Sequence, residues 1–248
     1  MTELVHLEIA DQVATITLDS DHNRNALSRQ LVTELAAHLV TADASDDVRA
    51  ILIRSAGSVF CSGADLSEAA SGGMADGAKA IVTLQRQIAT AAKPVVVELG
   101  GPVRAGGLGI LGAADIVIAA ESVTFQLTEV RLGLAAAIIS LSLIPRFTDR
   151  AASDLFLTAR KFDAHEAATA GLVTRAVPDD KLADEVAGAL ADLCKGYPQG
   201  LRESKRILNH DLVARIDALG DELAAKSAEL FGSDEAREAM TAFLNRKK

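Results

Sequence analysis

The sequence predicts an α/β fold followed by a helical region, and two observations carry that prediction. In the first half of the chain, short runs rich in β-branched residues alternate with amphipathic or glycine-rich segments, which is typical of parallel strands joined by crossover helices. From about residue 148 onward the apolar spacing is nearly all helical, without a linker, repeat or low-complexity tract. We therefore expect residues 1–195 to form an α/β core and residues 196–248 a helical extension packed on it.

The strands are expected wherever short apolar or alternating runs end in a turn. The first 18 residues predict a β-hairpin, in which polar and apolar residues alternate and Ala10-Asp11 makes the turn. Later runs such as Ala50-Ile51-Leu52-Ile53 are fully apolar, as in strands buried on both faces. The expected strands cover residues 4–9, 13–18, 50–53, 95–97 and 116–119, with one more at Leu172-Val173.

Helices are predicted where apolar residues recur every three or four positions. Leu27, Leu31, Leu35 and Leu39 share one face of the first helix. Further helices are expected over residues 78–92, shortly after Gly106-Gly107, over 180–194, 198–212 and 214–231, and from an N-cap near Ser233. Residues 69–77 contain three glycines and no apolar periodicity, so we expect them to be mobile.

Composition and charge narrow the classes of function. The chain has 25 basic and 34 acidic residues, a net charge of −9, which disfavours nucleic acid as a partner because phosphate binding needs a basic face. No apolar run approaches the roughly 20 residues of a membrane span, and the first residues lack the features of a secretory leader. Two cysteines are too few for a disulfide framework. We expect a cytoplasmic globular protein.

Several local patterns fail as functional motifs. Residues 107–112 spell G-x-G-x-x-G, but too little chain follows for a dinucleotide-binding unit of about 30 residues. Residues 72–79 resemble a phosphate loop, but Ala78 stands in place of its lysine. The five histidines have no partners at metal-ligand spacing, so we expect no bound metal. Cys61 lacks an identifiable base and is interpreted as a small buried residue.

Two turns of small residues are the most informative features. Residues 60–66 (FCSGADL) and 100–107 (GGPVRAGG) each follow a buried strand and open a helix. Small residues let backbone N–H groups approach a ligand closely, and a helix start adds partial positive charge. Two such turns on neighbouring strands are able to direct two N–H donors at one oxygen, which is an oxyanion hole.

These turns resemble those of the enoyl-CoA hydratase/isomerase (crotonase) superfamily, and the resemblance covers nearly the whole chain. The matching motifs are R-N-A-L at 24–27, F-C-S-G-A-D-L at 60–66, K-P-V at 93–95 with the glycines of 101–107, A-D at 114–115, E-V-R-L-G-L at 129–134 and the turn ending in G-L-V at 171–173. Asp21 stands where proline is usual, and Ala105 replaces the first glycine of a triplet.

The resemblance implies a spiral of ββα turns, C-terminal helices that build a homotrimer or a dimer of trimers, and an acyl-CoA thioester substrate with no separate cofactor. By position, the N–H groups of Ala64 and Gly106 hold the thioester oxygen and Glu129 is the catalytic acid/base. The remaining substrate-binding residues implied by position are Ala26, Ser62, Leu66 and Gly107, with Phe243 and Arg246 reaching CoA in an adjoining subunit.

One departure bears directly on the reaction. Hydratases of this family carry two glutamates; here the second is present as Glu129, and the first position is Gly109. Water addition needs a base at the water and an acid at C2. Because the G-x-G and E-V-R-L-G-L blocks resemble those of bacterial hydratase-like members, we expect hydration of a 2-enoyl-CoA by Glu129 alone. The alternatives are a 3-to-2 enoyl-CoA isomerase and a non-catalytic acyl-CoA-binding protein.

Four further residues qualify this expectation. Ala137 stands where dienoyl isomerases and aryl dehalogenases of the family need an aspartate, which argues against both activities. Arg104 is unexpected beside the second turn; an ion pair at a subunit interface is favoured over binding of a second carboxylate on the acyl group. The resemblance implies that Glu68 and Asp76 belong to a segment that borders the acyl pocket, and each is interpreted as either a solvated acid or a replacement for the missing carboxylate.

Overall fold

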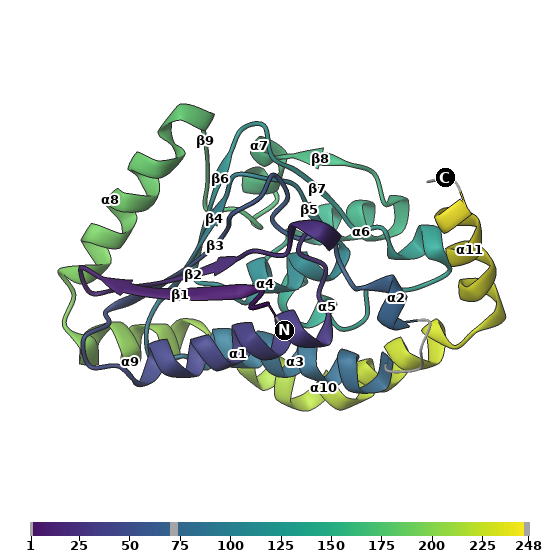
Figure 1. The fold of residues 1–248 in the computed structure, drawn as a ribbon, viewed down its shortest axis with the longest axis horizontal. Coiled ribbons are helices and arrows are strands. Elements are labelled where there is room, and N and C mark those ends of the chain that lie inside the picture. Colours follow the sequence, from purple (N-terminus) through teal and green to yellow (C-terminus); the bar gives the residue numbers. More distant parts are fainter. Residues whose placement is uncertain (1, 70–73, 246–248) are drawn as a thin grey trace.

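The computed structural model describes residues 2–69 and 74–245 and confirms the α/β class with a helical C-terminal region (Figure 1). The main sheet has the strand order β1-β2-β3-β4-β6-β9. Its β1–β2 pair is antiparallel, and the other pairs are parallel. The strands are β1 (Val5–Ala10), β2 (Val13–Leu18), β3 (Ala50–Ser55), β4 (Val95–Leu99), β6 (Ile116–Ala120) and β9 (Arg175–Val177).

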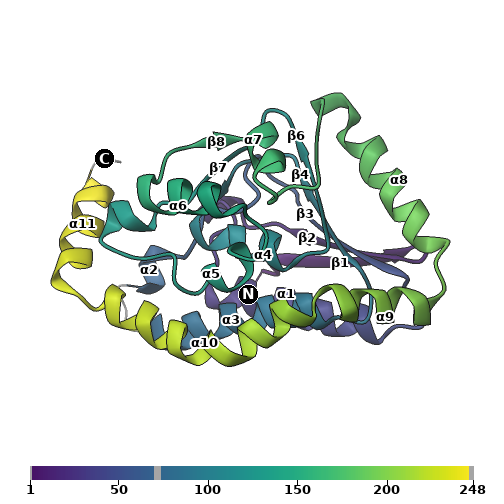
Figure 2. The ribbon, with the colours of Figure 1, turned by 180° about the vertical axis from the view of Figure 1, so that it is seen from behind.

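The helices wrap this sheet and extend beyond it at both ends (Figures 1 and 2). The α-helices are α1 (Arg29–Ala44), α2 (Leu66–Ala69), α3 (Met74–Thr90), α4 (Leu108–Ala113), α5 (Ser140–Leu143), α6 (Asp149–Thr158), α7 (Ala164–Thr169), α8 (Leu182–Cys194), α9 (Pro198–Leu208), α10 (His210–Phe231) and α11 (Asp234–Asn245). Short 3₁₀ turns are η1 (Asp21–Asn23), η2 (Ala105–Gly107), η3 (Glu129–Leu132) and η4 (Asp179–Lys181). In the described part of the chain, no helix is long and apolar enough to cross a membrane.

A second, three-stranded sheet was not predicted from the sequence. Its order is β5-β7-β8, formed by β5 (Val103–Arg104), β7 (Thr124–Gln126) and β8 (Phe162–Asp163). Strands of two or three residues are too short to show a period-two pattern. This small sheet places Arg104 and Gln126 in register on neighbouring strands, next to the second glycine-rich turn.

Five details of the predicted elements differ in the structure. The first hairpin turns at Asp11-Gln12 and not at Ala10-Asp11, because Ala10 ends β1 and pairs with Val13. Leu172-Val173 is not a strand, since β9 begins at Arg175. The first helix begins at Arg29, after the N-cap Ser28, and leaves Leu27 bridged to the first small-residue turn. The break between α9 and α10 falls at Asn209. Of the segment expected to be mobile, residues 74–77 form the first turn of α3, and 70–73 lie outside the described residues.

The break at Asn209 has a clear physical cause. The Asn209 side chain is buried and donates to Asp115 Oδ1 at 2.9 Å. Asp115 Oδ2 accepts from the Val95 amide at 2.7 Å and pairs with the buried Lys205 ammonium, also at 2.7 Å. These contacts tie the α9–α10 junction to the edge of the main sheet where β4 and β6 begin. The last helix starts as predicted, because Ser233 Oγ accepts from the Ala236 amide.

Candidate active site

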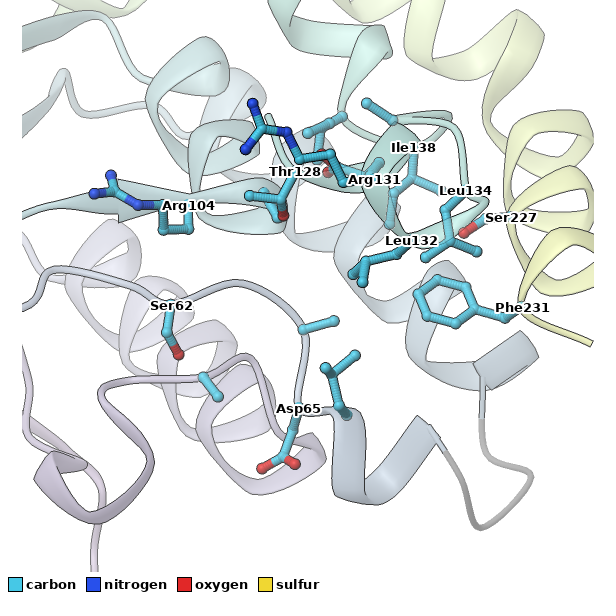
Figure 3. A pocket seen from close by; sticks show the side chains of 18 of the residues that line it. Ser62, Asp65, Arg104, Thr128, Arg131, Leu132, Leu134, Ile138, Ser227 and Phe231 are labelled. Carbon is cyan, nitrogen blue, oxygen red and sulfur yellow. The ribbon is translucent and has the colours of Figure 1, made fainter. Parts of the chain in front are cut away.

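A wide pocket of about 940 Å³ lies between the two small-residue turns, η3 and the C-terminal helices (Figure 3). The structure brings together in its wall most of the residues singled out from the sequence: Ala26, Ser62, Ala64, Leu66, Gly106 and Glu129. They come from four separate stretches of the chain. The fold therefore assembles the two turns and the carboxylate around one space.

The first turn is held by the segment that carries R-N-A-L. The Leu27 amide donates to Gly63 O at 2.8 Å, and the Ser62 amide donates to Arg24 O at 3.1 Å. Neither bond uses the Ala64 amide. Gly63 has φ +100°, a conformation that side chains rarely tolerate. The turn therefore has a fixed path, with Ala64 in the pocket wall.

The R-N-A-L segment itself depends on a buried asparagine. Arg24 and Asn25 both have positive φ (57° and 53°). The Asn25 side chain donates to Val59 O at 2.9 Å and accepts from the Ser20 amide at 2.7 Å. Asparagine tolerates this backbone region better than most residues. Its side-chain amide has both a donor and an acceptor, which bond the Val59 carbonyl and the Ser20 amide.

The second turn lies against the first. A Cβ on Gly106 would lie 3.8 Å from the Ala64 nitrogen, so the backbones of the two turns are adjacent. The Arg104 amide donates to Cys61 O at 2.9 Å and joins the strands that lead into them. Ala105 has φ +45°, a strained conformation at the residue that replaces a glycine of the family motif.

Gly107 does not belong to the pocket wall. A Cβ at Gly107 would lie 2.7 Å from Cys61 Cβ and 2.8 Å from Cys61 Sγ. Cys61 is fully buried, and burial raises the pKa of its thiol to about 12. Gly107 therefore allows the two turns to pack closely, and Cys61 is the small buried residue that its sequence context indicates.

Glu129 differs from the other carboxylates of the described residues in having a buried oxygen without a donor. It begins η3, and among the described residues no hydrogen-bond partner reaches its buried Oε2. Burial raises the pKa of Glu129 to about 7, against the lowering effect of its own and the Thr128 backbone amides. A carboxyl group with this pKa exchanges a proton readily near neutral pH.

Gly109 leaves no space for a second glutamate. A Cβ there would lie 2.8 Å from Ile139 Cγ2 and 3.3 Å from the Gln85 amide carbon. Gln85 is itself fixed, since it donates to Ile138 O at 3.1 Å and accepts from Ser142 Oγ at 2.6 Å. The position of the family's first glutamate is therefore filled by packed side chains.

The other acids near the pocket have structural partners. Burial alone would raise the pKa of Asp65, but hydrogen bonds from Ser67 and Asn23 lower it. Glu68 Oε2 accepts from the Arg29 amide at 2.9 Å, at the start of α1. Neither Glu68 nor Asp76 is among the described residues that line the pocket. Glu129 is thus the pocket carboxylate best suited to proton transfer.

The far end of the pocket is apolar and was not anticipated from the sequence. Figure 3 shows Leu132, Leu134 and Phe231 gathered there, with Ser227 beside them. Phe231 and Ser227 come from α10, so the amphipathic face of that helix was the available signal. Phe243 lies within α11, and Arg246 lies outside the described residues. In the part of the chain that is described, His, Cys, Asp and Glu form no metal-binding group.

Comparisons with known proteins agree with this geometry. Residues 8–248 match the model of the family "Enoyl-CoA hydratase/isomerase". A Rhizobium meliloti protein named "Probable enoyl-CoA hydratase" is 30% identical, over 99% of this chain and 96% of its own length. The crystal structure of an enoyl-CoA hydratase from Mycobacterium avium is 41% identical, with a TM-score of 0.92 over 99% of this chain and 98% of that one.

An enoyl-CoA hydratase/isomerase from Pseudoalteromonas atlantica gives a TM-score of 0.86 at 28% identity, covering 98% of this chain and 97% of that one. The likeness therefore extends across the α/β core and the C-terminal helices together. With its sequence, fold and paired small-residue turns in agreement, the chain belongs to the enoyl-CoA hydratase/isomerase family.

Proposed function

We propose that this enzyme adds water to a 2-enoyl-CoA thioester, with Glu129 as its acid/base and the Ala64 and Gly106 amides as its oxyanion hole. The observation that carries the proposal is the unpartnered, buried Glu129 oxygen in the wall of the same pocket as the two turns. A buried carboxylate oxygen without a donor is costly to the fold, and groups with raised pKa values cluster at functional sites.

In the proposed reaction, the water oxygen forms a bond to C3 while Glu129 takes a proton from the water. The C2–C3 π electrons move toward the thioester, whose oxygen becomes negative and is held by the two amides. Each such donor contributes about 3–4 kcal/mol to transition-state stabilisation. Glu129 then gives its proton to C2, and the thioester carbonyl re-forms in a 3-hydroxyacyl-CoA.

One carboxylate serves both steps if its pKa lies near the working pH. A group of low pKa is a poor proton donor to C2, and a group of high pKa is rarely ionised to accept the proton of water. The pKa of about 7 for Glu129 meets both needs. This argument supports hydration without a second glutamate.

The packed surroundings of Gly109 favour one other activity. With no carboxylate to hold a water opposite Glu129, the same group is able to remove a C2 proton from a 3-enoyl-CoA and return it at C4. That reaction forms a 2-enoyl-CoA and needs no water. The 3-to-2 isomerase is therefore the second candidate.

We also propose that the chain works as a homotrimer or a dimer of trimers in the cytoplasm, with Phe243 and Arg246 contacting CoA across a subunit boundary. Three large apolar side chains on or beside α9 support association: Tyr197, Ile207 and Leu208 are 86%, 74% and 79% exposed. Large apolar side chains exposed to this degree favour an interface with another subunit.

The deciding experiment follows the ultraviolet absorbance of the conjugated enoyl thioester. Loss of absorbance with crotonyl-CoA is the expected result and indicates hydration. A gain with 3-hexenoyl-CoA, and no loss with crotonyl-CoA, would make the enzyme an isomerase and overturn the first proposal.

Glu129→Gln keeps the size of the side chain and removes its proton exchange. We expect kcat to fall by roughly 10²–10⁴-fold, with binding of the saturated butyryl-CoA retained. Glu121→Gln is the matched control, because Glu121 is exposed and pairs with His165 on the surface. Binding without turnover in the unsubstituted protein would support a non-catalytic acyl-CoA-binding protein instead.

A further inference from the structure

We infer that Arg104 binds a second carboxylate on the acyl group, so that the preferred substrates are CoA half-thioesters of dicarboxylic acids. This inference rests on the proposed function of the same pocket. Its basis is an arginine of the pocket wall whose guanidinium group is fixed by the small sheet and has no counterion in the described chain.

The small sheet fixes the Arg104 side chain. Its Nη1 donates to Val103 O at 2.8 Å and to Thr124 O, and its Nη2 donates to Thr124 Oγ1 at 2.8 Å. A guanidinium has five N–H donors, and these contacts use three. The Nε–H and one Nη2–H are left, and two such donors match the two oxygens of a carboxylate.

The charge of Arg104 is not balanced within the described part of the chain. Its hydrogen bonds go to two carbonyls and a hydroxyl, and no carboxylate pairs with it. Burial accordingly lowers its pKa from the ordinary value. Burying such a charge is costly unless an anion joins it.

The pocket has a polar side as well as an apolar end. Figure 3 shows the guanidinium groups of Arg104 and Arg131 directed away from Leu134 and Phe231. Arg131 also lines the pocket and forms no ion pair among the described residues. The two guanidinium groups therefore lie on the side of the pocket opposite its apolar end.

A binding experiment tests this inference without relying on turnover. Glutaryl-CoA and pentanoyl-CoA have five-carbon acyl chains and differ in one terminal carboxylate, and both are saturated. Calorimetry with the unsubstituted protein should give a Kd for glutaryl-CoA about ten- to hundredfold lower, as expected for hydrogen bonds to a charged group. Adipyl-CoA and hexanoyl-CoA repeat the comparison with a chain one carbon longer.

Arg104→Met should remove this preference and leave the Kd for pentanoyl-CoA within about threefold. Arg104→Lys keeps the positive charge but lacks the two parallel N–H donors of the guanidinium, so it should retain part of the preference for glutaryl-CoA. This variant also tests the inference if Arg104→Met does not fold. Arg202→Met is the control, since Arg202 pairs with Glu203 on α9, away from the pocket.

Three results would overturn the inference. Equal affinity of the unsubstituted protein for the two members of each pair is the first. The second is an equal loss of affinity for both members and for free CoA in Arg104→Met, which would assign Arg104 to the phosphates of CoA. The third is that Arg104→Met keeps the preference but changes the oligomeric state measured by sedimentation. Arg104 would then be a contact with a second copy of the chain. Failure of the proposed hydration would show separately, as tight binding without turnover.

Discussion

Asp115 and Glu129 are both shielded from solvent, but they differ in the hydrogen-bond and ion-pair partners of their carboxylate oxygens. Asp115 accepts hydrogen bonds from the Val95 amide and the Asn209 side chain and pairs with Lys205. Glu129 keeps one oxygen without a donor in the described structure, and its pKa is raised. The first carboxylate joins the helical region to the core, whereas the second is kept able to exchange a proton. The number of donors around a buried acid thus separates a structural role from a chemical one.

The largest expected effect comes from removing the satisfied carboxylate. Asp115→Ala leaves the buried Lys205 ammonium without its anion, which should lower the free energy of unfolding by about 3–5 kcal/mol in urea titrations. Asp192→Ala is the control. Asp192 and Lys195 are both exposed, so we expect a change below about 1 kcal/mol. A similar small change for Asp115→Ala would remove the distinction between the two acids.

The opposite sign is expected for Glu129→Gln. The raised pKa means that the folded protein binds more protons than the unfolded chain between pH 4.5 and about 7, so this group lowers stability as pH rises through that window. The glutamine side chain has no charge to bury, so the variant does not lose stability in this way. It should be more stable than the parent by up to about 3 kcal/mol at pH 8 and equally stable at pH 4.5. A lower stability at pH 8 would mean that the carboxylate has a donor after all.

The third prediction concerns activity in the same pH range. Protonated Glu129 cannot take a proton from water, so kcat/KM for crotonyl-CoA should fall about tenfold per pH unit below pH 7 and level off above it. Initial rates from pH 5 to pH 9 give this profile. A midpoint near the ordinary glutamate value would show that Glu129 is not the group that limits the reaction.

The smallest expected effect tests whether the site also stores backbone strain. Ala105→Gly relieves the positive φ at the second turn but adds freedom to the unfolded chain, so the net gain in stability should be about 0.5 kcal/mol. Ala37→Gly, on the exposed face of α1, should instead lose about 1 kcal/mol. A comparable loss for Ala105→Gly would show that the strained conformation carries no cost.

The sequence was sufficient for the features that depend on local chemistry. The buried apolar runs predicted the central strands, the small residues predicted both turns, and Glu129 stood out because a motif surrounds it. The domain division at residue 195 and the roles assigned to individual site residues stay predictions. The alternation of strands and helices, together with the family resemblance, was enough for the fold class.

Long-range contacts explain what the sequence did not predict. Asn209 ends α9 because its side chain donates a hydrogen bond to Asp115. Asp115 is almost a hundred positions away in the chain, so no local sequence pattern predicts that bond. Strand β5 forms only because β7 lies beside it. The residue type of Arg104 is unusual beside the second turn and is visible in the sequence. The hydrogen bond from its guanidinium to Thr124 is visible only in the folded structure.

The contact between Gly107 and Cys61 also limits how this sequence can change over generations. A methyl group at 107 would overlap both Cβ and Sγ of Cys61, so a larger residue there requires glycine at position 61. The two positions are 46 residues apart in the sequence, yet a substitution at one depends on the residue at the other. A variant library that randomises them separately would discard combinations that work as pairs, whereas joint randomisation would recover them.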